Sequence, residues 1–489
     1  MTLTSREAAI ANTHIYATAA VAAAIGRRAL VLAAFLLALV SCASYRPLPL
    51  TPGAVDQALT IPSADILTRE AGKLHHPLLR PVKLDPDQPL SPEQAAVLAV
   101  LVNPSLRAQR DRAGVSSAQL MAAGLLPNPV LSSSLGILTG GPGTANSFST
   151  GPTWDVMSLL TREVKIQSAR ASLAQVRLDI AWSEWRTAEA AKGAVFALVA
   201  LQRELGQARD IDRLLNANLR VVQGAYRRHE RTILQLAAGR TASDSAHATA
   251  LALAQQVAQQ RMALLRALGV PADTPIRVRR GIPLASHLKL PSERQLLTGL
   301  ASRRLDLIAL HRGYQSQEYQ VRLAVLEQFP RISLGISRAK DNTGVYSVDL
   351  SAGIELPIFN HHQAAIAQQH ATRRQLYDEY IARVFTARAD IATLLADVGT
   401  LTPQIAAAKA ALPALQQLVK TYRTAVEQGN ADVLSYYSAW NSLDQKRIAL
   451  LGLEQQLESD RIALELAAGE PLPQPGERHS ARPGAEENG

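Results

Sequence analysis

RISLGIS (residues 331–337) and YSVDLSAGIELP (residues 346–357) are two runs in which apolar residues alternate with polar or small ones. Alternation with a period of two places one set of side chains on each face of a β-strand. The polar, turn-prone residues 339–344 separate the two runs, so the sequence predicts a β-hairpin. Over residues 391–426 the apolar positions instead advance by three and four, which is typical of the packed seam of a helix. At about 1.5 Å per residue, a helix over 361–427 would be roughly 100 Å long, which is unusual for a compact globular domain.

The first half of the chain carries the same order of features. A helix is expected to start at Ser91-Pro92, strand-like runs follow at 130–138 and 153–160, and a long helix then extends over about 161–237. The landmarks that pair between the halves are Asn103 with Arg304, Pro127 with Pro330, Gly239 with Gly429, and Gly269 with Gly469. Their offsets are all close to about 200 residues, which indicates an internal repeat. The sequence therefore predicts a duplicated unit of helix, β-hairpin and long helix.

This repeat and the flanking composition divide the chain into six predicted segments. They are a lipoprotein signal peptide (1–41), an N-terminal extended segment (42–90), the first repeat (91–270, with a hairpin at about 129–160), an equatorial linker (271–290), the second repeat (291–470, with a hairpin at about 330–357) and a disordered tail (471–489). Alanine is abundant and aromatic residues make up only 4% of the chain, so most of it is expected to be helical.

The N-terminal region has the layout of a secretory signal. Arg27-Arg28 precede an apolar run at 29–40 that is too short to span a bilayer. The segment LVSC (39–42) resembles the bacterial lipobox, whose cysteine becomes the acylated first residue of the mature protein; the alternative is an incidental cysteine beside a hydrophobic run. Cys42 is the only cysteine, which excludes an intrachain disulfide, and Ala43 rather than aspartate follows it, which favours outer-membrane sorting. We therefore expect a lipoprotein anchored through acyl chains such as palmitate on Cys42.

Charge and motif content argue against nucleic-acid binding and catalysis. The formal net charge is +10, but no Lys- and Arg-rich run with interleaved aromatic residues occurs, so a basic solvated surface is the better interpretation. The chain lacks HExxH, GxxxxGK[ST], GxGxxG and GxSxG motifs. Its neighbouring histidine pairs, His75-His76 and His361-His362, would point about 100° apart on a helix and would not form a bidentate metal site there. The sequence predicts a protein that is not an enzyme, needs no cofactor or metal, and binds no nucleic acid.

Several features together resemble the TolC family, the outer-membrane factors of tripartite efflux and secretion systems. The motifs that carry the resemblance are the lipobox, the duplicated unit, LPNPVLS (126–132), RLDL (304–307), GIELPIF (353–359), and Tyr422 followed by Gly429. The resemblance covers nearly the whole mature chain. It implies a mainly α fold with a β-barrel contribution, in which three protomers each give four strands to one 12-stranded outer-membrane β-barrel. The helices would form a long α-helical barrel across the periplasm.

In the TolC family, the turn between the long descending helix and the shorter ascending helix forms a periplasmic tip that closes the tunnel. The residues that match this tip are Gly239, Arg240, Ser243 and Asp244 in the first unit, and Gly429, Asn430, Asp432 and Ser435 in the second. A charged pair at this constriction is expected to hold the tip closed until a partner displaces it. The alternative is that these residues are helix caps and solvated turn residues; for Arg240 with Asp244 we favour gating.

The resemblance implies the exit duct of a tripartite efflux system. Such a duct passively conducts metal cations or drugs from pump and adaptor across the periplasm and the outer membrane. The implied partners are two further copies of the chain, a periplasmic adaptor (membrane fusion) protein, an inner-membrane pump of the RND type, and outer-membrane lipid. The PNPVLS run (127–132) favours the heavy-metal branch. Alternatives are a type I secretion exit duct and a structural periplasmic lipoprotein without a pore; the alternation at 331–356 argues against the latter.

Overall fold

The computed structural model describes residues 44–85, 88–141 and 145–472, which belong to two compact units. The first unit, residues 1–58, contributes most of helix α2 (Pro52–Leu59) to the described part of the chain. The second unit begins at Leu59. The predicted signal peptide with Cys42 lies outside the described residues, as does the predicted tail from residue 473 onward.

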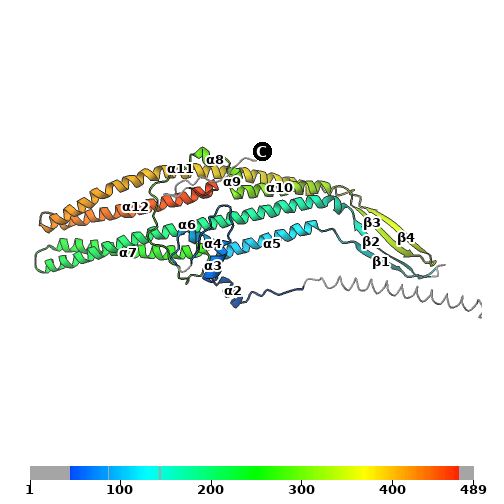
Figure 1. Ribbon diagram of the computed structural model, residues 1–489, viewed down its shortest axis with the longest axis horizontal. Coiled ribbons are helices and arrows are strands. Elements are labelled where there is room, and N and C mark those ends of the chain that lie inside the picture. Colours follow the sequence, from blue (N-terminus) through cyan, green and yellow to red (C-terminus); the bar gives the residue numbers. More distant parts are fainter. Residues whose placement is uncertain (1–43, 86–87, 142–144, 473–489) are drawn as a thin grey trace, which may run out of the picture. The chain divides into compact units, whose positions relative to one another are not determined.

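The second unit consists of long helices, short helices and one small sheet (Figure 1). Its helices are α3 (Ala64–Gly72), α4 (Pro92–Val102), α5 (Pro104–Gly124), α6 (Met157–Arg227), α7 (Ile233–Leu268), α8 (Glu293–Leu297), α9 (Leu300–Arg303), α10 (Leu305–Leu326), α11 (Gln363–Glu427) and α12 (Val433–Ala468). Its strands are β1 (Val130–Gly136), β2 (Ser147–Asp155), β3 (Ile332–Lys340) and β4 (Tyr346–Ile354). The order of helix, hairpin, long helix and shorter helix occurs twice, which confirms the predicted duplicated unit.

The four strands form one antiparallel sheet in sequence order. Val130 lies opposite Thr153 in the first hairpin and Ile332 opposite Ile354 in the second, while Trp154 lies opposite Leu334 where the hairpins meet. Every residue of β4 is exposed. Among the described residues, β1 and β4 each have one edge without a partner strand. The isolated chain therefore presents two rows of unpaired backbone groups.

The second strand of the first hairpin differs from the predicted strand at 153–160. β2 covers Ser147–Asp155 instead, because this segment pairs with β1 on one side and β3 on the other. The strand ends at Asp155, whose Oδ1 accepts a hydrogen bond of 2.9 Å from the Met157 amide at the first residue of α6. The Asp155 side chain thus satisfies one of the free amides that begin every helix.

Two helical hairpins extend from the middle of the unit in the direction away from the sheet (Figure 1). Residues 228–232 join α6 to α7, and residues 428–432 join α11 to α12. Both bounds of α12 are shifted by 200 residues from those of α7. Gly269 and Gly469 then end the two helices in the left-handed conformation, with φ of 77° and 74°, which glycine adopts at low cost.

Helix α11 passes through Pro403 and Pro413 without ending at either. The seam predicted for this helix is present, because Ile391, Val398 and Ile405 are buried. One 18-residue window of α11 has a mean hydropathy of 1.2, so by length and composition alone this helix is apolar enough to cross a membrane. Because α11 packs along α12, the apolar stripe of α11 is buried in the contact between these two helices.

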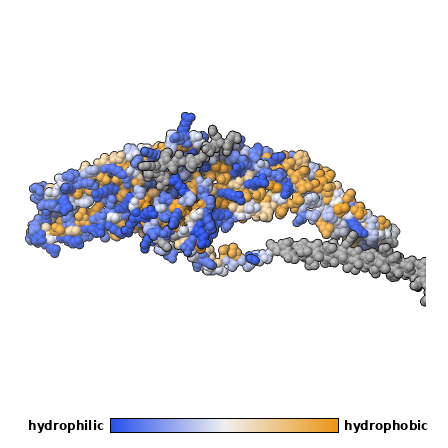
Figure 2. Space-filling model, in the orientation of Figure 1, coloured by the Kyte–Doolittle hydropathy of each residue, from blue (hydrophilic) through white to orange (hydrophobic). Residues whose placement is uncertain are grey.

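The middle of the unit contains the largest core, where α3, α4, α6 and α7 meet with Ile462 of α12. A neighbouring cluster adds Leu305 of α10 against α4 and α6. The RLDL motif (304–307) links the start of α10 to the end of α12. Arg304 donates from Nε and Nη2 to the two carboxylate oxygens of Asp306 at 2.9 and 2.7 Å, and from Nη1 to the carbonyl oxygen of Ala467 at 3.1 Å. A Cβ at Gly469 would lie 2.4 Å from Cγ of Arg304, so the end of α12 can approach this arginine only as glycine. Figure 2 shows hydrophobic residues gathered over the sheet and the adjoining helix ends, while the helical hairpins are mostly hydrophilic on this face.

Candidate functional site

The second helical turn holds the four second-half residues predicted for the tip, at or beside the bend. Gly429 has φ of 75°, a conformation that few other residues adopt without strain. The amide of Asn430 donates to the carbonyl oxygen of Ala425 at 2.8 Å and closes the end of α11. Asp432 is the N-cap of α12, makes no side-chain capping bond and remains exposed. The amide of Ser435 donates to the Asp432 carbonyl oxygen at 3.2 Å in the first turn of α12.

The first-half residues predicted for the tip do not lie in a turn, and the predicted pairing of Gly239 with Gly429 is wrong. Gly239, Arg240, Ser243 and Asp244 all lie inside α7. The turn is at residues 228–232, and its left-handed residue is His229, with φ of 63°. The sequence gives no glycine at this position, and Gly239 is the nearest glycine after it. A strict offset of 200 residues from Gly429 would have located the turn.

Local contacts explain why the chain turns at residues 228–232. Thr232 and Gln235 form a capping box, in which Thr232 Oγ1 accepts from the Gln235 amide at 3.2 Å and Gln235 Oε1 accepts from the Thr232 amide at 3.1 Å. This arrangement satisfies two amides at the start of α7. The amide of Glu230 donates to the Ala225 carbonyl oxygen at 2.9 Å, as Asn430 does to Ala425 in the second turn. The two turns therefore share one geometry.

Gly239 and Ser243 are buried where α7 faces neighbouring helices. A Cβ on Gly239 would lie 3.3 Å from the hydroxyl oxygen of Tyr437 on α12. The glycine thus permits close approach of the two helical hairpins and does not form a bend. Arg240 and Asp244 are exposed, and no ion pair joins them in the described part of the chain.

The charged contact at the first turn is between Arg228 and Glu230, which sequence reasoning missed. Arg228 donates from Nε and Nη2 to the two carboxylate oxygens of Glu230 at 2.9 and 3.0 Å. This hydrogen-bonded pairing raises the pKa of Arg228 and lowers that of Glu230. The first turn and its flanks read RRHER (227–231), whereas the second reads EQGNAD (427–432), so the two turns differ in charge.

Potential metal ligands do not gather in the described residues, where no group of three or more His, Cys, Asp or Glu side chains could hold an ion. The two neighbouring histidine pairs have structural contacts instead. Nε2 of His76 lies 2.9 Å from the Ala181 carbonyl oxygen on α6, and burial lowers the pKa of this imidazole. His362 is the N-cap of α11 with φ of 58°. Neither His361 nor His362 belongs to a group of three or more potential metal ligands among the described residues.

A buried charge cluster lies where α6 and α12 cross in the middle of the unit. Lys192 pairs with Glu189 at 2.6 Å, and Arg461 pairs with Glu458 at 2.8 Å and Glu465 at 2.6 Å. Burial raises the pKa of Glu465 to about 7, against the opposing effect of Arg461. Sequence reasoning missed this cluster; the available signal was charged residues at spacings of three and four inside an apolar helix.

Comparison with known proteins gives a family for the second half of the chain. Residues 296–470 match the family described as outer membrane efflux protein. These residues form an outer membrane efflux protein domain. The domain contains α9 to α12, both strands of the second hairpin and the second turn. No curated protein matches the chain by sequence.

Solved structures extend the likeness of the outer membrane efflux protein domain to the fold of most of the chain. The channel protein CusC shares 22% identity and a TM-score of 0.66, over 78% of this chain and 92% of that one. The CmeC outer membrane channel of Campylobacter jejuni shares 14% identity and a TM-score of 0.67, over 89% and 96%. The MtrE outer membrane channel of Neisseria gonorrhoeae, in its open state, shares 18% identity and a TM-score of 0.61, over 81% and 97%. The two halves together therefore have the fold of outer membrane channels.

Proposed function

We propose that the protein is a trimeric outer-membrane lipoprotein that serves as the passive exit duct of a tripartite efflux system. Cys42 would carry the lipid anchor, and the helical hairpins would extend into the periplasm. The duct would conduct substrates without catalysis and without a cofactor.

The observation that carries this proposal is the small sheet with its two unpaired edges. A backbone that spans lipid must pair every amide and carbonyl, and a sheet of four strands cannot do so alone. Closure with the sheets of two other copies would pair β4 of one protomer with β1 of the next. Tyr346, Val348 and Leu350 share one face of β4, and Ser347, Asp349 and Ser351 share the other. This pattern fits a lipid-facing outside and a water-facing inside.

The proposed partners follow from the duct role. A duct without an energy source needs an inner-membrane pump, for which we propose the RND type, and a periplasmic adaptor that contacts the helical tip. Metal cations, in the heavy-metal branch, are the proposed substrates, with drugs as the alternative.

Single-channel conductance of the purified protein in a planar bilayer tests the proposal, together with the particle mass in detergent. We expect a trimer that gives discrete conductance steps. A monomer that gives no conductance would overturn the duct and support the alternative of a structural periplasmic lipoprotein. Export of a polypeptide, and not of small solutes, by the assembled system would support the type I secretion alternative.

A further inference from the structure

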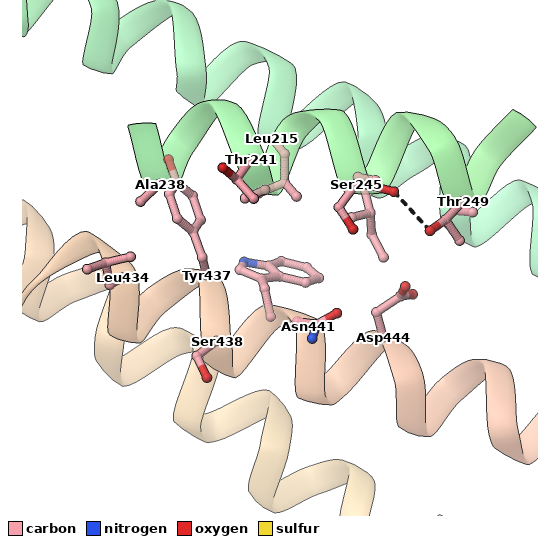
Figure 3. A pocket seen from close by; sticks show the side chains of 15 residues that line it. Leu215, Ala238, Thr241, Ser245, Thr249, Leu434, Tyr437, Ser438, Asn441 and Asp444 are labelled. Carbon is pink, nitrogen blue, oxygen red and sulfur yellow. Dashed lines mark hydrogen bonds between the residues drawn. The ribbon is translucent and has the colours of Figure 1, made fainter. Parts of the chain in front are cut away.

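A cavity of about 450 Å³ lies between α12 and the α6–α7 hairpin, close to the helical turns (Figure 3). Ala208, Ile211, Leu215, Ala238, Thr241, Ala242, Ser245, Ala246 and Thr249 form one wall, and Leu434, Tyr437, Ser438, Trp440, Asn441 and Asp444 form the other. The first wall consists mostly of small or apolar side chains and includes three hydroxyl groups. The second wall contains the two aromatic rings, those of Tyr437 and Trp440. Asp444 is the one charged residue among these fifteen.

Three polar atoms of the α12 wall lack hydrogen-bond partners in the described part of the chain. They are the hydroxyl oxygen of Tyr437, Nε1 of Trp440 and Oδ1 of Asp444. Figure 3 shows Tyr437 and Asp444 projecting from α12 toward α7. Tyr437 is only 8% exposed, so water does not readily replace the missing partner. A buried polar atom without a partner destabilises the folded state, and three in one cavity are unusual in a native protein.

The Asp444 carboxyl is the only acidic side chain in the cavity lining. Burial raises its pKa, and Arg447, one turn further along α12 and outside the cavity lining, opposes the shift. A cation inside the cavity would stabilise the ionised carboxylate directly. The remaining walls supply apolar contact and the indole face of Trp440, which attracts positive charge.

We propose that this cavity binds a small organic cation with a flat aromatic body. The positive charge would pair with Asp444, the ring system would lie against Trp440, and the hydroxyl of Ser245 would be available for polar substituents. The Thr241 hydroxyl donates to the Ala237 carbonyl oxygen at 3.0 Å and could only accept a hydrogen bond from the ligand. The volume corresponds to roughly 15 water molecules and falls within the range of small-molecule sites.

Other classes of ligand fit the cavity less well. A metal ion is usually held by several carboxylate, imidazole or thiolate ligands, and among the described residues no group of three or more Asp, Glu, His or Cys side chains could hold one. An anion would meet the Asp444 carboxylate, and a neutral apolar molecule would leave that carboxylate buried without a partner. The cavity lies within one chain, so it would bind its ligand whether or not the trimer conducts.

Fluorescence anisotropy of ethidium, titrated with the full-length protein in a non-ionic detergent at neutral pH, tests the proposal. We expect saturable binding of one ethidium per chain. Asp444→Asn removes the charge at constant shape and should weaken binding at least tenfold. Asp390→Asn is the matched control, because Asp390 is an exposed carboxylate on α11 outside the cavity, and its affinity should stay within twofold of wild type. Phenanthridine, the neutral parent ring system, should bind weakly, with no dependence on Asp444.

A second variant tests the site independently in case Asp444→Asn does not fold. Ser245→Trp places a large ring into the cavity from the exposed rim of α7, leaves Asp444 in place, and should abolish ethidium binding. Particle mass and helical circular dichroism check the fold of each variant. Binding of ethidium to Asp444→Asn within twofold of wild type, or no saturable binding to the wild type, would overturn the site. Conducting trimers without ethidium binding would refute the site alone, and ethidium binding without conductance would refute the duct alone.

Discussion

Burial controls the protonation of Glu465, and this makes stability depend on pH. Its pKa is raised from 4.5 to about 7 in the folded chain. The folded state therefore holds a proton that the unfolded state has lost between these two pH values. The resulting stabilisation is complete below about pH 4.5, is lost as pH rises through about 7, and amounts to about 3 kcal/mol. We predict that thermal unfolding, followed by helical circular dichroism, shows Glu465→Gln less sensitive than wild type to a rise from pH 5 to pH 8.

Two comparisons isolate this effect. Glu318→Gln, at a half-buried carboxylate paired with Arg373, should leave the pH profile unchanged. His76 acts in the opposite direction, because its lowered pKa makes stability fall as pH drops, and it is present in both proteins being compared. An identical pH slope in Glu465→Gln and wild type would contradict the prediction.

The proposed gate at the periplasmic tip also depends on single side chains. Asp244 and Asp432 are exposed carboxylates, the first inside α7 and the second at the N-cap of α12. If they hold the tip closed through polar contacts, Asp244→Ala with Asp432→Ala should raise single-channel conductance at least twofold in planar bilayers. Asp378→Ala, an exposed carboxylate paired with Arg374 near the sheet end of α11, is the control and should leave conductance unchanged. Unchanged closed-state conductance in the double variant would remove both residues from the gate.

Residue patterns located the second turn but not the first, for a physical reason. A left-handed residue at a helix end is usually glycine, so Gly429 is visible in the sequence. His229 occupies the equivalent position with the same sign of φ and carries no such signal. The cavity could not be predicted either, because it depends on which helix faces which. The spacing of the buried charges is visible in the sequence, but their burial depends on the same packing.

At the scale of helices, Gly239 marks the contact between α7 and α12. Replacing glycine by alanine inside a helix usually stabilises by up to about 1 kcal/mol. At Gly206 on α6 a Cβ meets no atom within 4 Å, so Gly206→Ala should show this gain as a higher melting temperature. At Gly239 the new Cβ would lie 3.3 Å from the Tyr437 hydroxyl, so Gly239→Ala should show no gain or a loss. Equal gains in both variants, measured by thermal unfolding, would show that the two helices do not pack closely there.

Element types were largely predictable, and element ends were not. Alternation found β3 and β4, and periods of three and four found α11, because each pattern reports directly on the local geometry. The strand β2 was misplaced, since its SFSTGPTWD sequence (147–155) alternates weakly and its position is set by pairing with β1 and β3. The pairing of β2 with β3, which unites the two repeats in one sheet, is a tertiary contact that no local pattern encodes.

For the whole molecule, closure of a barrel assigns opposite roles to neighbouring residues of β4. Leu350 is 82% exposed in the single chain and belongs to the apolar face, whereas Ser351 belongs to the polar face. An arginine on the lipid face costs about 2–4 kcal/mol near the bilayer midplane, and a trimer would bear this cost in all three copies. We predict that Leu350→Arg lowers the yield of outer-membrane trimer, measured by membrane fractionation and by particle mass in detergent.

Ser351→Arg is the matched variant, since the same charge one residue along would face the water-filled lumen. Trimer yield should remain near wild type, and single-channel conductance should change because three added positive charges would line the pore. Normal assembly of Leu350→Arg with failed assembly of Ser351→Arg would mean that the faces are reversed. Normal assembly and unchanged conductance of both variants would mean that these strands do not form a membrane barrel at all.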